Sequence, residues 1–240
     1  MEKPAPVLLA LILVLTLSAA GQGAAGLAMM DHPPAVEAMD MGSLFSAVLF
    51  GETPLGRRWA ALRPEAEKLF PALKMKAVAD LHMTVVYVGR DWRTEDLDRL
   101  RQAMALQLGA PVRLHPEIAT FGRNGQVIAV ELKGIPESLQ AQIVAMKAQL
   151  NAAGLKKPEA YDASFRAHVT LAETKENPPT AAQRSDLQAF AEWIVPRLDL
   201  SSLRVSLEPA MPVLLLLAGA TRPNPIPEYI TVDGFLKSRR

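Results

Sequence analysis

The chain has 240 residues, of which 50% are hydrophobic and 21% are charged, a composition that suits a folded domain and excludes a disordered chain. Its 26 lysine and arginine residues nearly balance 25 aspartate and glutamate residues, and the net charge of +1 excludes a broad basic surface for duplex DNA. Cysteine is absent, which excludes disulfides and thiolate metal sites.

The N-terminal segment has the pattern of a secretory signal peptide. The apolar run from Val7 to Leu17 follows Lys3 and precedes small residues. This run is shorter than the roughly 20 apolar residues that span a bilayer. We therefore expect residues 1–25 to be a signal peptide, with a retained N-terminal anchor as the alternative. The expected location is extracytoplasmic, either periplasmic or secreted, with no stable membrane partner unless the leader is uncleaved.

Residues 26–42 mix proline, aspartate and methionine without periodicity and predict a linker before a domain over 43–240. The N-terminal part of this domain predicts, in order, a strand over 43–50, a helix over 53–73, a strand over 82–88 and a helix over 94–108. Pro64 is expected to interrupt the first helix, and Thr94 is expected to cap the second.

The rest of the domain is predicted to contain a β-hairpin and further alternating strands and helices. It predicts strands over 112–122 and 126–134, helices over 136–155 and 180–195, a strand within 167–173, and strands over 198–207, 211–219 and 228–236. Pro136 and Gly154 mark the ends of the first of these helices. Because hairpin signals argue against a purely parallel sheet, the predicted class is α+β.

Two strands repeat an H-x-T pattern, in "LHMTVVYVG" (81–89) and "AHVTLAE" (167–173), and together they use two of only four histidines. Side chains alternate along a strand, so His82 and Thr84 share a face, as do His168 and Thr170. The residues expected to pack into the opposite layer are Met83, Val85, Val169 and Leu171.

Paired imidazoles and hydroxyls suit displacement at phosphorus. One imidazole can take a proton from water while the other gives a proton to a leaving oxygen. Threonine hydroxyls can donate to the non-bridging phosphate oxygens, where charge develops. A single H-x-T is more often an ordinary half-buried strand, but its duplication in matching context favours a catalytic pair without a metal.

The two motifs resemble those of the 2H phosphoesterase superfamily, which includes the RNA 2′,3′-cyclic phosphodiesterases often labelled 2′-5′ RNA ligases. "LHMTVVYVG" resembles the first motif, and "SFRAHVTLAE" resembles the second. The resemblance extends to "LFSAVLF", to "GQVIAVEL", to the helix before the second motif and to Tyr229, and so spans most of residues 43–236.

This resemblance implies a bilobal α+β fold with two pseudo-symmetric lobes. Each lobe would have a mainly antiparallel sheet flanked by helices, with the active-site cleft between them. His82 would donate a proton to the leaving ribose oxygen, and His168 would be the base that activates water, although pseudo-symmetry allows the reverse. Thr84 and Thr170 would hold the phosphate. The implied protein is a monomeric phosphoric diester hydrolase with no cofactor or metal, acting on a 2′,3′-cyclic nucleotide or RNA end.

The sequence departs from the family pattern at two positions. Ala167 replaces the usual proline, and Glu173 stands where a basic residue is common. A carboxylate near the cleft is expected to repel a polyanion, which argues against long RNA. The alternatives are a phosphodiesterase for another substrate, such as a 2′-5′ oligonucleotide or ADP-ribose cyclic phosphate, and a non-catalytic exported ligand-binding module of the same fold.

Further side chains flank the predicted strands. Candidates for stacking on a base or contacting phosphate are Tyr87, Phe121, Arg123, Tyr161 and Arg166. His115 has no threonine partner and is interpreted as structural, and His32 is interpreted as a solvated linker residue. A zinc site formed by three histidines is disfavoured because close ligand spacing is absent.

Overall fold

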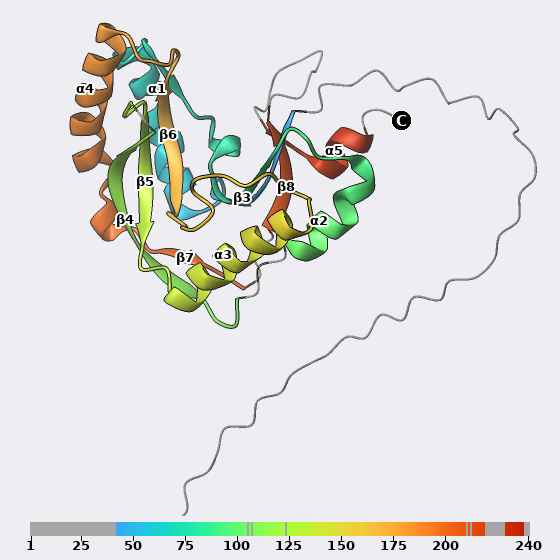
Figure 1. The fold of residues 1–240 in the computed structure, drawn as a ribbon. Helices are drawn as coiled ribbons and strands as arrows, with labels where there is room; N and C mark the ends of the chain where they lie inside the picture. Colours follow the sequence, from blue (N-terminus) through green and yellow to red (C-terminus); the bar gives the residue numbers. More distant parts are fainter. Residues whose placement is uncertain are drawn as a thin grey trace, which may run out of the picture. The chain divides into compact units, whose positions relative to one another are not determined.

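The computed structural model describes residues 42–104, 106, 108–122, 124–209, 211, 213–218 and 229–237. The predicted leader, and the predicted linker except Gly42, lie outside the described residues. Two antiparallel sheets form the described part (Figure 1). The four-stranded sheet contains, in order, β3 (His82–Gly89), β1 (Ser43–Leu49), β8 (Val213–Ala218) and β9 (Tyr229–Thr231). The five-stranded sheet contains, in order, β2 (Leu73–Met75), β6 (His168–Thr174), β5 (Val127–Lys133), β4 (Val112–Phe121) and β7 (Val205–Leu207).

Helices pack beside both sheets, which confirms the α+β class. They are α1 (Pro54–Leu69), α2 (Leu97–Ala103), α3 (Glu137–Ala152), α4 (Ala181–Leu198) and α5 (Val232–Lys237). Helices α1 and α4 contact each other and strands of the five-stranded sheet, whereas α3 contacts β3 and α2 (Figure 1). Helix α1 follows β1 in sequence yet packs on the other sheet, so the two halves of the fold are interleaved.

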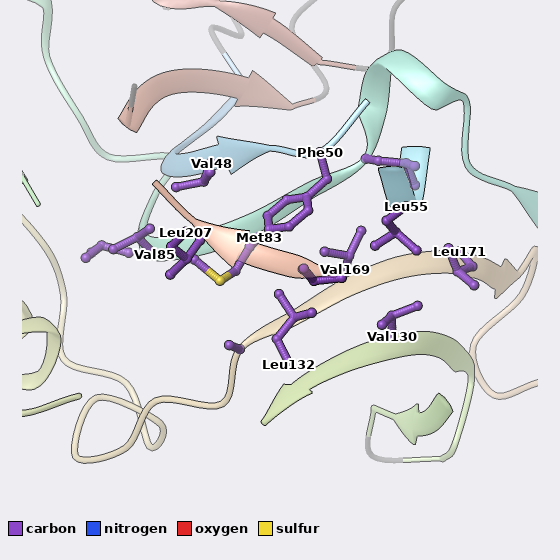
Figure 2. Packing of buried hydrophobic residues seen from close by; sticks show 14 of the residues in the cluster. Val48, Phe50, Leu55, Met83, Val85, Val130, Leu132, Val169, Leu171 and Leu207 are labelled. Atoms are coloured by element: carbon purple, nitrogen blue, oxygen red, sulfur yellow. The ribbon is translucent and has the colours of Figure 1, made fainter. Parts of the chain in front are cut away.

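One hydrophobic core joins the two H-x-T strands. Met83 of β3 and Val169 of β6 are both 0% exposed and belong to the same buried cluster (Figure 2). Val85 and Leu171 are buried in it as well, which confirms the predicted alternation. Burying each such side chain contributes roughly 1.5–3 kcal/mol. The core therefore holds both motif strands in one packed unit.

The first two helices differ from the prediction. Helix α1 continues through Pro64 without interruption. Pro64 lies on the exposed face, while Trp59 and Ala66 are buried on either side of it, so packing offsets the lost backbone hydrogen bond. Thr94 does not cap the second helix, because it begins a short 3₁₀ turn over Thr94–Asp96. Helix α2 follows this turn and ends at Ala103, before the predicted end.

Two predicted strands near the C-terminus are partly helical. Residues predicted as a strand from 198 include the end of α4 and a 3₁₀ turn over Leu200–Ser202, and β7 covers only Val205–Leu207. The segment predicted as a strand over 228–236 changes from β9 to α5 at Val232. Short apolar runs fit a strand and a helix equally well, and tertiary packing decides between them. Among the described residues, no helix combines the length and apolarity needed to cross a membrane.

Candidate active site

Strand β3 presents His82 and Thr84, both half-buried, on the face opposite the core residue Met83. The Nδ1 atom of His82 lies 2.8 Å from the carbonyl oxygen of Asp80, two residues earlier. The ring of Phe45, on the neighbouring strand β1, lies 5.1 Å from the imidazole between ring centroids. Backbone and aromatic contacts therefore both orient this side chain.

Strand β6 repeats the arrangement. His168 and Thr170 are half-buried on the face opposite Val169. The Nδ1 atom of His168 lies 3.0 Å from the carbonyl oxygen of Arg166, again two residues earlier. The ring of Phe121 stacks on this imidazole, with centroids 4.2 Å apart and planes 21° apart. Each motif thus supplies an oriented imidazole beside a hydroxyl.

The two carbonyl contacts assign the same tautomer to both imidazoles. A carbonyl oxygen only accepts hydrogen bonds, so Nδ1 carries the hydrogen in His82 and in His168. Nε2 is then the nitrogen that gains or loses a proton in each ring. Both rings can therefore serve in acid–base chemistry through the same atom.

Both motif strands also carry one extra residue directly after the threonine. On β3 the extra residue is Val85, because consecutive residues of β1 pair with the residues on either side of it. On β6 the extra residue is Leu171, by the same pattern against β5. Such a bulge shifts the alternation by one. Tyr87 and Glu173 consequently share a face with the threonines, although they lie three positions after them.

A cavity of about 680 Å³ lies between the two sheets. The predicted site residues in its lining are Thr84, Tyr87, Phe121, Tyr161, Arg166, His168 and Thr170. His82 is not in the lining; it lies two residues before Thr84 on the same strand face, roughly 7 Å along the strand. Arg123 lies outside the described residues. The structure therefore brings seven of the predicted side chains around one cavity, which includes His168, while His82 lies on the same strand as the lining residue Thr84.

Arg166 links several of these groups. Its guanidinium donates to both carboxylate oxygens of Glu131, at 2.6 and 2.8 Å, and lies 4.1 Å from the centre of the Phe121 ring. The hydrogen bonds from Arg166 lower the pKa of Glu131 to about 2, despite its burial, and Lys133 acts in the same direction. Glu131 stays ionised at neutral pH and holds the arginine in place.

Burial lowers the pKa of His168 below the ordinary histidine value of 6.5. The positive charge of Arg166 acts in the same direction, whereas the hydrogen bond to the Arg166 carbonyl and the charge of Glu131 oppose it. A lowered pKa favours the neutral ring at neutral pH. His168 is therefore suited to accept a proton.

The expected repulsion by Glu173 is wrong. Its carboxylate lies 2.9 Å from the Nζ atom of Lys76 and 3.3 Å from that of Lys74. Lys76 is buried and Lys74 is more exposed. The two ammonium groups more than compensate the single negative charge of Glu173, so it does not present an uncompensated carboxylate to a substrate.

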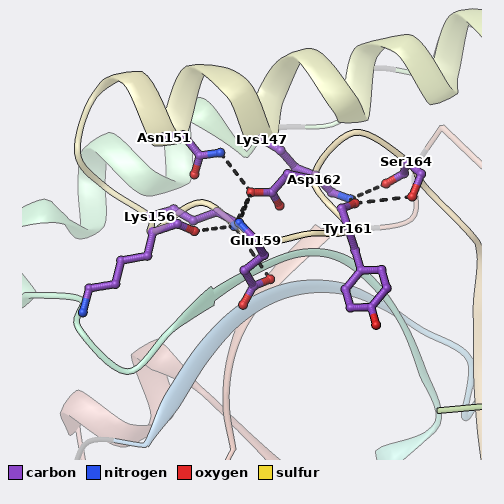
Figure 3. A network of polar contacts seen from close by, with 8 residues as sticks. Lys147, Asn151, Lys156, Glu159, Tyr161, Asp162 and Ser164 are labelled. Carbon is purple, nitrogen blue, oxygen red and sulfur yellow. Dashed lines mark hydrogen bonds and ion pairs between the residues drawn. The ribbon is translucent and has the colours of Figure 1, made fainter. Parts of the chain in front are cut away.

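The loop that leads into β6 carries the predicted residues Tyr161 and Arg166, but its polar network with α3 was not predicted. Asp162 accepts hydrogen bonds from Lys156 and Asn151, and Lys147 of α3 donates to the carbonyl oxygen of Ser164 (Figure 3). Desolvation lowers the pKa of Lys147. One signal was present: Lys147 lies four residues after Ile143, on the apolar stripe of α3. A lysine on a buried stripe indicates a partner from another segment.

His115 lies apart from this cavity. It lines a separate hollow of about 210 Å³ that also contains Arg113 and Arg204. Among the described residues, no group of three histidine, cysteine, aspartate or glutamate side chains is arranged to hold a metal ion.

Comparison with protein families decides the relationship. Residues 51–205 match the family model described as the 2′-5′ RNA ligase superfamily, and this segment contains both H-x-T motifs. The chain belongs to the 2′-5′ RNA ligase superfamily. Superfamily members are 2H phosphoesterases, so the general chemistry is phosphodiester hydrolysis or ligation. A search of curated proteins found no match.

Several solved structures are similar to this member of the 2′-5′ RNA ligase superfamily. TT0787 of Thermus thermophilus is 20% identical, with a TM-score of 0.48 over 79% of this chain and 94% of that one. LigT of E. coli, solved with 3′-AMP, is 16% identical, with a TM-score of 0.47 over 80% of this chain and 94% of that one. A protein of unknown function from Agrobacterium tumefaciens is 14% identical, with a TM-score of 0.46 over 78% and 88%.

Proposed function

We propose that the protein hydrolyses a 2′,3′-cyclic phosphate on a nucleotide or RNA end without a metal or cofactor. The observation that carries this proposal is the duplicated arrangement of His82 and His168. Each has Nδ1 hydrogen-bonded to the carbonyl two residues earlier, and each shares a strand face with a threonine. Duplicated acid–base groups match a reaction that needs one proton accepted and one donated.

The proposed roles assign one protonation state to each histidine. His168 accepts a proton from water through Nε2, and its lowered pKa supports that role. The water oxygen bonds to phosphorus as the bond to one ribose oxygen breaks. His82 starts as the imidazolium, with hydrogens on both nitrogens, and gives that oxygen its Nε2 proton while Nδ1 keeps its hydrogen bond to the Asp80 carbonyl. Thr84 and Thr170 donate hydrogen bonds to the non-bridging oxygens, where negative charge increases.

The cavity supports a nucleoside as the organic part of the substrate. Its lining includes Tyr87, Phe121 and Tyr161, and the first and last of these are exposed. Stacking a base on an aromatic side chain contributes roughly 1–3 kcal/mol and tolerates any base. The apolar leader in the sequence supports an extracytoplasmic site of action.

A hydrolysis assay tests this function. The full-length chain is incubated with 2′,3′-cyclic AMP in excess EDTA, beside the variants His82→Ala and His168→Ala. General acid and base catalysis contribute roughly 10²–10⁴-fold each, so we expect each variant to lose activity by that factor. His115→Ala is the matched control, because His115 lines a different hollow. It is expected to retain wild-type turnover.

Two outcomes would count against the proposal. A folded wild type that does not hydrolyse the cyclic nucleotide excludes this substrate, and a 2′-5′ oligonucleotide and ADP-ribose cyclic phosphate are then assayed in its place. Activity that survives both histidine substitutions excludes the proposed site itself.

A further inference from the structure

His168 is supported by a sequence of contacts that ends at a buried carboxylate. The Phe121 ring stacks on the imidazole, the Arg166 guanidinium lies on the Phe121 ring, and Glu131 binds that guanidinium through both oxygens. We call these four residues the His168 stack. Glu131 belongs to β5 and lies opposite His168 in the strand register. The stack therefore connects three neighbouring strands and the residue two positions before His168.

The corresponding position beside His82 is different. Leu49 of β1 lies opposite His82, in the place that Glu131 takes opposite His168. Leucine cannot bind an arginine, and the residue two positions before His82 is Asp80 rather than an arginine. The Phe45 ring near His82 is tilted by 40° and more distant, at 5.1 Å. The two histidines therefore differ at both positions, with leucine in place of the carboxylate and aspartate in place of the arginine.

Arg166 acts on His168 in two ways. Its carbonyl oxygen accepts the hydrogen bond from Nδ1, and its side chain covers the ring that stacks on the imidazole. The arginine side chain is 57% exposed, whereas that of Glu131 is 8% exposed. An exposed arginine side chain has many rotamers, and a bidentate carboxylate selects one of them. The buried Glu131 thus fixes the position of the exposed Arg166.

We propose that Glu131 is a positioning residue that, through Arg166 and Phe121, holds the His168 imidazole in the orientation the reaction requires. The inference rests on the proposed function, because it assumes that His168 takes part in proton transfer. Glu131 itself does not line the cavity. Any effect of Glu131 on the reaction is therefore transmitted by Arg166 and Phe121. Misplacing a reacting group by about 1 Å can lower the rate by 10²-fold.

The first test compares substitutions at Glu131. Glu131→Leu introduces the residue that β1 has at the corresponding position, and we expect kcat for 2′,3′-cyclic AMP to fall about 10- to 100-fold while KM changes less than about threefold. Glu131→Gln retains one acceptor for Arg166 and is expected to give an intermediate kcat. Glu117→Gln is the control, because Glu117 is the exposed cross-strand neighbour of Glu131 on β4 and makes no hydrogen bond or ion pair with the four residues of the stack. It is expected to keep the wild-type kcat.

A second substitution separates positioning from general damage to the fold. Phe121→Leu removes the stacking ring but keeps the Glu131–Arg166 ion pair, and it is expected to lower kcat by a similar factor. If Glu131 and Phe121 act on His168 through the same series of contacts, kcat of the double variant is little lower than kcat of either single variant. Additive losses would overturn the proposal, as would a folded Glu131→Leu or Phe121→Leu variant with wild-type kcat.

Nuclear magnetic resonance gives a readout that does not depend on turnover. The imidazole Nδ1–H signal of His168 is assigned by its disappearance in His168→Gln. We expect this signal to broaden or vanish in Glu131→Leu and to persist in Glu117→Gln. A wild type without activity would remove the proposed function, while the signal would still report whether Glu131 orients the ring. An unchanged signal in Glu131→Leu would overturn the positioning role.

Discussion

The strands β3 and β6 have the same local design but different neighbours. Each has a half-buried histidine and threonine, a buried residue between them and an extra residue after the threonine. Across the sheet, however, His82 faces Leu49 and His168 faces Glu131. After the bulge, β3 presents Tyr87 to the cavity, whereas β6 presents Glu173 to two lysines.

This difference separates what the strand backbones do from what the surrounding side chains do. The backbone of each strand places an imidazole beside a hydroxyl, and the local arrangement is the same in β3 and β6. The surrounding side chains then give the two imidazoles different environments. A pseudo-symmetric frame can therefore support an asymmetric reaction, in which one histidine accepts a proton and the other donates one.

The largest expected effect tests the core that both strands share. Met83→Ala removes a fully buried side chain and is expected to lower the free energy of unfolding by about 2–5 kcal/mol. Val169→Ala removes fewer atoms from the same cluster and is expected to cost less. Urea unfolding at neutral pH measures both. A loss under about 1 kcal/mol in Met83→Ala would show that the two strands are not held by a common core.

Removal of the hydroxyls tests the symmetry of phosphate binding. Thr84→Val and Thr170→Val keep the side-chain shape but remove a donor to the developing charge, so each is expected to lower kcat by about 10²–10³-fold. Steady-state kinetics on the cyclic nucleotide gives both values, with Thr174→Val on the same strand as a control outside the cavity lining. Equal losses support matched roles, and a loss at only one threonine would break the comparison.

Acid titration distinguishes Glu131 from its counterpart Leu49, which cannot titrate. The pKa of Glu131 is lowered in the folded protein from 4.5 to about 2, so its contribution to stability is present above about pH 4.5 and is lost as pH falls toward 2. We expect the urea midpoint of Glu131→Gln to vary less with pH over this window than that of the wild type. If the urea midpoints of the wild type and of Glu131→Gln changed equally with pH, the ion pair between Glu131 and Arg166 would be contradicted.

The smallest expected effect is a shift in the pH at which the rate falls on the acidic side. A base must be neutral, so the proposed role of His168 predicts that activity falls as pH drops through the pKa of this residue. Because burial lowers that pKa, the acidic limb of kcat/KM is expected below pH 6.5. Initial rates at constant ionic strength locate the limb. A limb above 6.5 would indicate that another group, with a raised pKa, is the base.

The motif strands could be predicted from sequence because their signal is local. Alternation along "HMTVV" and "HVTLA" places the histidine and threonine on one face whatever the rest of the chain does. Tyr87 and Phe121 could be proposed on similar grounds, and both line the cavity. The compensated charge of Glu173 could not be predicted, since Lys76 lies 97 positions away in the chain.

Features that depend on strand register could not be predicted from the sequence. Glu131 binds Arg166 across 35 positions of sequence, and only the pairing of β5 with β6 places them together. The bulges at Val85 and Leu171 are likewise defined by the facing strands. Pro64 failed as a helix breaker for a related reason, because buried neighbours outweighed a local rule.

The order in which the chain visits the two sheets has a consequence for how activity arises. The chain alternates between them from β1 to β4, stays in the five-stranded sheet through β7, and then returns to complete the four-stranded sheet with β8 beside β1. Such distant pairings form late, because loop closure must come first. A folding intermediate built from β1 to β7 would contain both histidines and still lack β8. The four-stranded sheet that carries His82 is therefore expected to be completed after the sheet that carries His168.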